Sequence, residues 1–470
     1  METNKASRTI RYHAKSGLFA SAAERRSFQY FQSQACKPLG GHFHSSFWGR
    51  EVLQAAVHYP SIRHLVIALG SAYEVFEVGS SDRETPLTLQ QCNLAIRQLA
   101  SPGLLTSDAS SEEVTFCTLT ASVLFIYLAS IRGRYFEAFQ HIRSSAKILQ
   151  EHDRSTRSHL NAATRAASSA YPVPIPRLRS LLASAYAQFR GMVNDAFLDK
   201  GSIDILVSDL KPATVFTSLQ EAHAYVERLH QNTLAFLQAS EHELEPQSGE
   251  ALEAAVTRHR ELSQALESSQ NALDFLAQGL SESGEDDDQE SIAILRVYHL
   301  LVAIWLRIDI FHPDKRETGY DVWEEHFKEI LGLCEFIVRR QQRTKARWGQ
   351  PSCTSGLGYV MPLHMVAARC RNPDLRWRAV ELLLAHPQRE TLWDSQLAGK
   401  VVAQVIELEE HHVDGMADLP AEDCARVSPE QRVREVKLEF QGEEDSIKAH
   451  FVKVEDWKLG RRGLVKRIQL

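Results

Sequence analysis

The stretch over residues 356–410 constrains the fold most, because its apolar residues recur at helical spacing between well-placed prolines. A helix is expected after Pro362, and Pro373 marks the start of a second one, since proline fits the first turn of a helix. The second helix must end before Pro387, because the residue before a proline disfavours the helical region. A third helix is expected over residues 394–410, so the whole stretch is expected to be helical, as packed antiparallel helices.

The charged residues of this stretch predict ion pairs between helix ends rather than an anion-binding site. They comprise four arginines and three acids: Arg371, Arg376, Arg378, Arg389, Glu381, Glu390 and Asp394. No spacing joins the histidines and the cysteine of the stretch into a catalytic group. The whole chain lacks a phosphate loop, a dinucleotide glycine fingerprint, a nucleophile elbow and a paired-histidine protease helix, and Gly356-x-Gly358 is too short to count as one of them. We therefore predict no catalytic residues, no cofactor and no enzyme activity.

Two runs of the chain resemble a known family. PLHMVAARCRNPDLRWRAVELLLAHPQRETLWDS, over residues 362–395, is similar to the C-terminal signature of the regulatory domain of fungal transcription factors that usually carry a binuclear zinc cluster. A second run over residues 35–74 is similar to a segment near the other end of that domain, and the two occur in the expected order. The resemblance implies a nuclear transcription regulator rather than an enzyme, with the cytoplasm as the alternative location.

In that family a six-cysteine zinc cluster precedes the regulatory domain and presents a helix to the DNA major groove. Here the first cysteine is Cys36, and all seven cysteines are widely spaced. The resemblance thus implies that promoter DNA is contacted only if a partner or an N-terminal module supplies the contact, and the DNA-binding residues are unknown. It also implies protein partners or a homodimer, a possible small-molecule effector, and control of a secondary-metabolite gene cluster. The alternative is a helical interaction or effector-sensing protein that lost DNA binding.

Two groups of residues are candidates for binding a metal ion. Zinc would be expected from Cys and His side chains, and the candidates are Cys36, His42, His44 and His58. Their spacing fits no compact finger, so we interpret them as packing and surface residues. Residues 281–290 are acidic but lack the alternating ligands of a calcium loop, and we predict a solvated loop there. No metal site is expected.

Composition is typical of a soluble globular protein, with 44% hydrophobic and 24% charged residues in a chain of 470. The net charge of −7 gives no overall attraction to nucleic acid. Residues 114–129 are apolar but shorter than the roughly 20 residues that cross a membrane, so we predict a buried helix that forms a hairpin with residues 135–149 through Gly133. The basic run over residues 339–348 is read as a charged helix end rather than a nucleic-acid or import site. An intracellular protein without a membrane segment is expected.

The chain is predicted to be mainly α, a multi-helical bundle or irregular α-superhelix with a small C-terminal β-hairpin. The hairpin follows from the alternation of Val436, Leu438 and Phe440 with polar residues and from a second alternating run after residue 445. The expected parts are a mobile N-terminal arm (1–17), the N-terminal helical part of the regulatory domain (18–153), a linker or long loop (154–176), a helical body (177–430), and the hairpin with a basic, loose tail (431–470).

Overall fold

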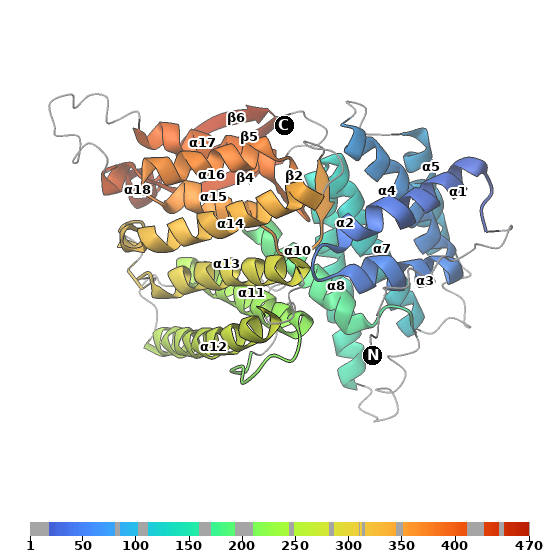
Figure 1. The fold of residues 1–470 in the computed structure, drawn as a ribbon, viewed down its shortest axis with the longest axis horizontal. Helices are drawn as coiled ribbons and strands as arrows, with labels where there is room; N and C mark the ends of the chain where they lie inside the picture. The colour runs from blue at the N-terminus through green and yellow to red at the C-terminus, as the bar shows by residue number, and fades with distance from the viewer. Residues whose placement is uncertain are drawn as a thin grey trace.

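A computed structural model describes residues 18–79, 85–101, 111–158, 171–192, 210–243, 249–281, 286–309, 311–312, 315–344, 351–410, 427–440 and 446–469 (Figure 1). The architecture is mainly α with two small sheets, which confirms the predicted fold class. The predicted N-terminal arm lies outside these residues.

The N-terminal part is a group of helices that lies on one side of the molecule, drawn in blue to green in Figure 1. Its elements are α1 (Ala22–Tyr30), the π-helix η1 (Phe31–Ala35), α2 (Cys36–Gly40), the π-helix η2 (Phe47–Glu51), α3 (Val52–His58), α4 (Pro60–Val78), α5 (Pro86–Leu99), α7 (Ser111–Arg132), α8 (Tyr135–Ser158) and α10 (Ile175–Arg190). Helix α4 shows how sequence sets its ends: Pro60 stands in the first turn, and Gly79 ends it in the left-handed region at φ 69°. The predicted hairpin of α7 and α8 turns at Gly133, whose φ is 73°.

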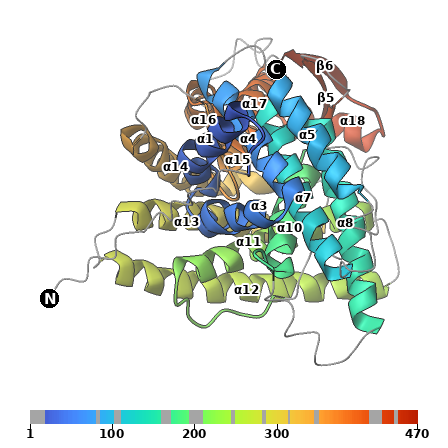
Figure 2. The same ribbon diagram turned by 90° about the vertical axis from the view of Figure 1, so that its right-hand side faces the viewer.

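The remaining helices stack in layers on the other side of the molecule, and the C-terminal sheet lies at one end of this stack (Figures 1 and 2). Their elements are α11 (Leu219–Glu243), α12 (Gly249–Ser281), α13 (Asp286–Arg307), the 3-10 helix η6 (Thr318–Trp323), α14 (Glu324–Thr344), β1 (Ser352–Thr354), α15 (Val360–Arg369), α16 (Pro373–Ala385), β2 (Gln388–Glu390), β3 (Trp393–Asp394), α17 (Ser395–Glu410), the 3-10 helix η7 (Pro429–Gln431), β4 (Val433–Glu439), β5 (Ser446–Lys453), α18 (Val454–Lys458) and β6 (Leu464–Gln469). Helices α15, α16 and α17 confirm the three helices expected over residues 356–410. Asn372 caps α16 by accepting hydrogen bonds from the N–H groups of Asp374 and Leu375 at 3.0 and 3.3 Å.

Buried apolar residues form two cores. The first core joins α1 to α10 with one side of α17 and the C-terminal sheet. The second core joins α11 to α16 with the other side of α17. Helices α7 and α13 are long and apolar enough to cross a membrane, but 78% and 83% of their most apolar windows are buried inside the protein. The structure thus confirms that residues 114–129 form a buried helix.

The first of the two sequence runs that carry the family resemblance packs against the segment around β1, which shortly precedes the second run. The indole N–H of Trp48 donates to Ser355 Oγ at 2.9 Å, and Ser355 Oγ donates to the Leu39 carbonyl at 2.6 Å. On the other side, the guanidinium of Arg389 lies 5.0 Å from the centre of the Phe76 ring. The segment with β1, β2 and β3 therefore closes one side of the first core.

The two small sheets correct one expectation each. Strands β4 and β5 form the predicted antiparallel hairpin, but β6 pairs with β5 along its whole length, from Phe451–Leu464 to Ser446–Gln469. The tail expected to be loose is therefore the third strand of a sheet. The strands β2 and β3 also interrupt the stretch over residues 356–410 that was expected to be helical throughout.

Two further boundaries differ from the sequence expectations. Helix α13 begins at Asp286, inside the acidic run that was expected to be a loop, and acidic residues favour the N-terminus of a helix. Helix α8 continues to Ser158 and α10 begins at Ile175, so helix occupies both ends of the stretch expected to be a linker.

Candidate functional site

A cavity of about 240 Å³ lies between the two cores. Its walls come from α10, α11, α13, α15 and β4, with further residues from η6, β3 and α17. This space is large enough for several water molecules or one small organic molecule. A cavity with a wall from several packed elements is the usual place for a small-molecule site.

The walls of the cavity are partly aromatic and partly apolar. Tyr298 and Trp305 enter from α13, Tyr320 from η6 and Trp393 from β3, while Leu234, Leu237, Met361 and Met365 lie between them. The ring of His230 stands edge-on to Tyr298 at 5.0 Å between centroids. These flat surfaces suit a planar or apolar part of a ligand.

Several buried polar groups of the lining have an atom without a hydrogen-bond partner. They are His230 Nε2, His364 Nδ1, Gln238 Oε1 and Glu227 Oε1. Burial lowers the pKa of His230 to about 3, so its ring is neutral and offers one donor and one acceptor. Polar atoms that are buried without a partner cost free energy, so these groups are ready to bond a ligand or water.

The opposite wall is basic. Arg316, Arg434 and Lys437 line the cavity there, and the Arg434 guanidinium stacks on Trp457 at 3.9 Å from the ring centre. Burial, and then the charge of Arg316, lower the pKa of Arg434 to about 10. The charges of Glu317 and Glu435 act in the opposite direction, but the basic side chains of the lining outnumber the acidic ones, so the cavity favours an anionic group of a ligand.

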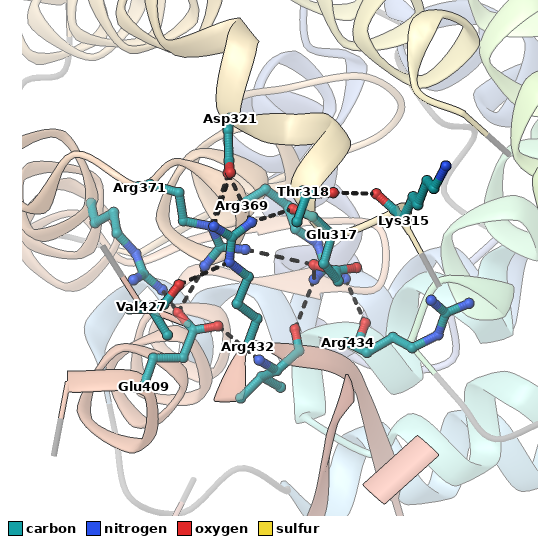
Figure 3. A network of polar contacts seen from close by, with 12 residues as sticks. Lys315, Glu317, Thr318, Asp321, Arg369, Arg371, Glu409, Val427, Arg432 and Arg434 are labelled. Atoms are coloured by element: carbon teal, nitrogen blue, oxygen red, sulfur yellow. Dashed lines mark hydrogen bonds and ion pairs between the residues drawn. The ribbon is translucent and has the colours of Figure 1, made fainter. Parts of the chain in front are cut away.

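A buried ionic network supports this basic wall (Figure 3). Glu409 on α17 is fully buried and accepts hydrogen bonds from Arg371 at 3.0 Å, Arg376 at 2.6 Å and the Val433 N–H at 2.8 Å. Burial alone would raise the pKa of Glu409, but Arg371 and Arg376 lower it below its ordinary value. This carboxylate is therefore held ionised between two helices and a strand.

The network extends from Glu409 to the cavity through Arg369. Its guanidinium donates to Glu317 at 2.7 Å and to the carbonyls of Val433 and Arg434 at 2.8 and 2.7 Å. Arg432 makes two hydrogen bonds to the Asp321 carboxylate, at 2.8 and 2.9 Å. The start of β4, which carries Arg434, is thus fixed by side chains from α15 and η6.

The ion pairs predicted from the sequence are present only in part. Arg389 pairs with Asp394 at 2.9 Å, whereas Arg378 pairs with Glu381 of its own helix at 3.0 Å and with Glu335 of α14 at 2.7 Å. Arg371 and Arg376 instead bind Glu409, and Glu390 accepts the N–H groups of Tyr359 and Val360 at 2.8 and 3.0 Å at the start of α15. Burial raises the pKa of Glu390 to about 8.

The glycines at 356 and 358 have a packing role. A Cβ on Gly358 would lie 2.1 Å from Glu390 Oε1, and one on Gly356, where φ is +93°, would lie 2.8 Å from His44 Nε2. Both positions therefore require glycine because buried side chains occupy the space beside the backbone.

The structure places the four residues named as zinc candidates in different surroundings. Cys36 is buried and donates its thiol to the Trp48 carbonyl at 3.2 Å, His42 lies 3.2 Å from Glu290, and His58 is exposed. His44 is fully buried and lies beside His223 and Glu227 of α11. The run HAYVERLH of α11 places His223, Glu227 and His230 at helical spacing among buried apolar residues, which is the sequence signal that could have located the polar lining.

The basic run at the end of α14 is described only up to Thr344. Arg339 and Arg343 are exposed there, and Arg339 pairs with Glu335 at 2.7 Å. The described part is therefore a charged helix end, as expected.

The chain is a distant relative of a fungal transcription regulator. That protein is the aspercryptin biosynthesis cluster-specific transcription regulator atnN of Emericella nidulans, to which the chain is 23% identical over 496 residues, covering 87% of this chain and 77% of that protein. No family model and no solved structure matches the chain. The similarity supports a fungal transcription regulator, not an enzyme, at the level of the family.

Proposed function

We propose that this protein controls transcription of a fungal biosynthetic gene cluster, and that its helical body is the regulatory part. The observation that supports this most is the extent of the similarity to a cluster-specific regulator, which covers 87% of the chain and hence the folded body rather than one short motif. A regulator of this class acts in the nucleus.

The helical body does not provide the thiolates of a zinc cluster in the part of the chain that the structure describes. Cys36, Cys117, Cys334, Cys353 and Cys370 are buried and lie on different elements. Burial raises the pKa of Cys36 to about 12, whereas zinc binds the thiolate. Contact with promoter DNA is therefore assigned to a partner protein or a separate module, and a second copy of the chain is one candidate partner.

The cavity is assigned to a small-molecule effector. Its basic wall, aromatic sides and unpartnered polar groups provide the three kinds of contact that a small amphipathic molecule needs. A ligand there contacts both cores, so binding changes the free energy with which they pack and can shift the protein between two states.

Deletion of the gene tests the regulatory role. Transcripts of a biosynthetic cluster are expected to change when the gene is deleted, and immunoprecipitated chromatin is expected to contain the promoters of that cluster. Fusing the full chain to a heterologous DNA-binding domain should then alter a reporter without the natural partner. Loss of the gene with no change in any transcript would refute the proposal, and reporter activity without promoter occupancy would assign the chain to the interaction-protein alternative.

Filling the cavity tests the effector role. Met365 lines the cavity and is partly buried, so Met365→Trp is expected to occupy the space, whereas Met365→Leu leaves it nearly unchanged. With the same DNA-binding fusion, the Trp variant should fix the reporter in one state under both inducing and non-inducing growth. A folded Trp variant that still responds like the Leu variant would exclude this cavity as the effector site.

A further inference from the structure

Three ionisable side chains from distant parts of the chain meet at the boundary of the two cores. His44 lies in the turn between α2 and η2, while His223 and Glu227 are one helical turn apart on α11 and share a face of that helix. Among the described residues, these three form the cluster whose ligand atoms lie within 4.8 Å of one another. All three are buried, with exposed fractions of 3%, 4% and 2%.

Ligand atoms of this cluster lack hydrogen-bond partners. Both ring nitrogens of His44, Nε2 of His223 and Oε1 of Glu227 are buried and unbonded. Native proteins rarely leave so many buried polar atoms unsatisfied in one place, and a bound ion or water molecule is a usual partner for them. The site therefore fits a ligand that accepts electron pairs from two imidazoles and a carboxylate.

Aromatic packing and a glycine hold the rings in place around this site. Phe43 stacks on His223 at 4.0 Å between centroids, and His44 stands edge-on to His223 at 5.1 Å. A Cβ on Gly356 would lie 2.8 Å from Nε2 of His44 and 3.9 Å from Nε2 of His223. The absence of a side chain at 356 keeps the space next to both nitrogens open.

We propose that His44, His223 and Glu227 bind one divalent transition-metal ion, with zinc as the natural occupant. Around a tetrahedral zinc ion with bonds of about 2.0–2.2 Å, ligand atoms are about 3.4 Å apart, so small side-chain rotations close the site. Three protein ligands leave a fourth position for water or another small donor.

The charges around the site select the kind of ion. Arg177 acts electrostatically on all three side chains and thus balances the carboxylate of Glu227, so the protein offers a bound cation little net negative charge. Calcium and magnesium rely on several carboxylate oxygens and are disfavoured here. Zinc and its neighbours in the first transition row bind imidazole nitrogen strongly enough without that charge.

Such an ion would join the two halves of the protein. His44 belongs to the N-terminal group of helices, and α11 packs in the second core, so one metal bridges them. Glu227 also lines the cavity, which places the metal beside its polar end. The site thus adds a cross-link between elements that lie far apart in the sequence, while His230, His364 and Gln238 remain for a ligand in the cavity.

Metal binding can be measured on the full chain purified without a polyhistidine tag. We expect one zinc per chain by mass spectrometry after equilibration with zinc and gel filtration, and a visible absorption spectrum of tetrahedral nitrogen and oxygen ligation when cobalt replaces zinc. His230→Ala is the matched control, because His230 is also buried and lacks a partner at Nε2 on the same helix but lies outside the cluster.

Three variants remove single ligands: His44→Ala, His223→Ala and Glu227→Gln. Loss of an outer-shell partner already costs about 10–100-fold in affinity, so each ligand variant should weaken zinc binding by roughly 100-fold or more, while His230→Ala keeps it. Added zinc should raise the melting temperature of the wild type and the control but not of the ligand variants. A folded wild type that takes up no zinc, or ligand variants that bind zinc as tightly as the control, would overturn the proposal. If a histidine variant fails to fold, the Glu227 variant still tests the site.

Discussion

Replacing Glu409 with glutamine tests the buried ionic network. The side chain is 0% exposed and binds two guanidinium groups, of which that of Arg376 is 2% exposed. Glutamine keeps an acceptor for the Val433 N–H but removes the buried counter-charge of Arg376, whereas Arg371 keeps Glu317 at 3.6 Å. Removing one partner of a buried ion pair costs about 3–5 kcal/mol, so the free energy of unfolding should fall by that amount.

Thermal and urea unfolding, followed by far-ultraviolet circular dichroism, measure this loss. With an unfolding entropy of about 2.1 cal/mol/K per residue, this loss lowers the melting temperature of a folding unit of about 300 residues by roughly 5–8 °C. Glu381→Gln is the matched control, because Glu381 also binds an arginine, Arg378, but its side chain is 65% exposed. Exposed ion pairs contribute about 0–1 kcal/mol, so the control should stay close to the wild type.

The pH dependence of the same pair of variants gives a second measurement. The pKa of Glu409 is lowered in the folded state, so its ionised form stabilises the protein above the ordinary value of about 4.3, and this stabilisation is lost as the pH falls through the lowered value. The gap between the wild type and Glu409→Gln should therefore be full at pH 7 and shrink in acid. Equal melting temperatures of the Glu409 and Glu381 variants at pH 7 would refute the assignment of the network as a stabilising element.

Two further changes test the packing around α15. Gly358→Ala should destabilise the protein strongly, because its Cβ would overlap Glu390. Gly332→Ala in α14 is the control: its Cβ would meet nothing within 4 Å, so it should stabilise the protein by about 0.5–1 kcal/mol. Melting temperatures compare the two variants, and a tolerated Gly358→Ala would contradict the close approach. The pKa of Glu390 is raised to about 8, so the folded state retains a proton that the unfolded state loses above about pH 4.3, and the free energy of unfolding should fall as the pH rises from 4.3 to 8. Glu390→Gln should remove this pH dependence. Urea unfolding at several pH values measures it, and an unchanged slope in the variant would contradict the assignment.

Local signals in the sequence predicted the helices well. Pro373 and Pro387 set the bounds of α16, and the apolar run from residue 114 predicted the buried helix α7. Such features depend on neighbouring residues and can be read without knowing the fold.

Features that depend on distant residues could not be predicted in this way. Arg376 and Glu409 are 33 residues apart, and both had nearer residues of opposite charge as candidates. Strand β6 buries only Ile468 and exposes most of its other side chains, so it has no strong alternation. His44 meets His223 only because α11 packs against the turn after α2, and no local pattern connects the two.

The closing of the first core by β1 to β3 bears on how the protein is made in the cell. Cys353 and Leu392 belong to that core, although most of its other members precede residue 193. At a synthesis rate of about 5–20 residues per second, roughly 10–40 seconds separate the two parts at the ribosome. During that interval the nascent N-terminal helices expose an apolar surface that β1 to β3, α17 and the C-terminal sheet cover only later, which makes this chain a natural client of chaperones.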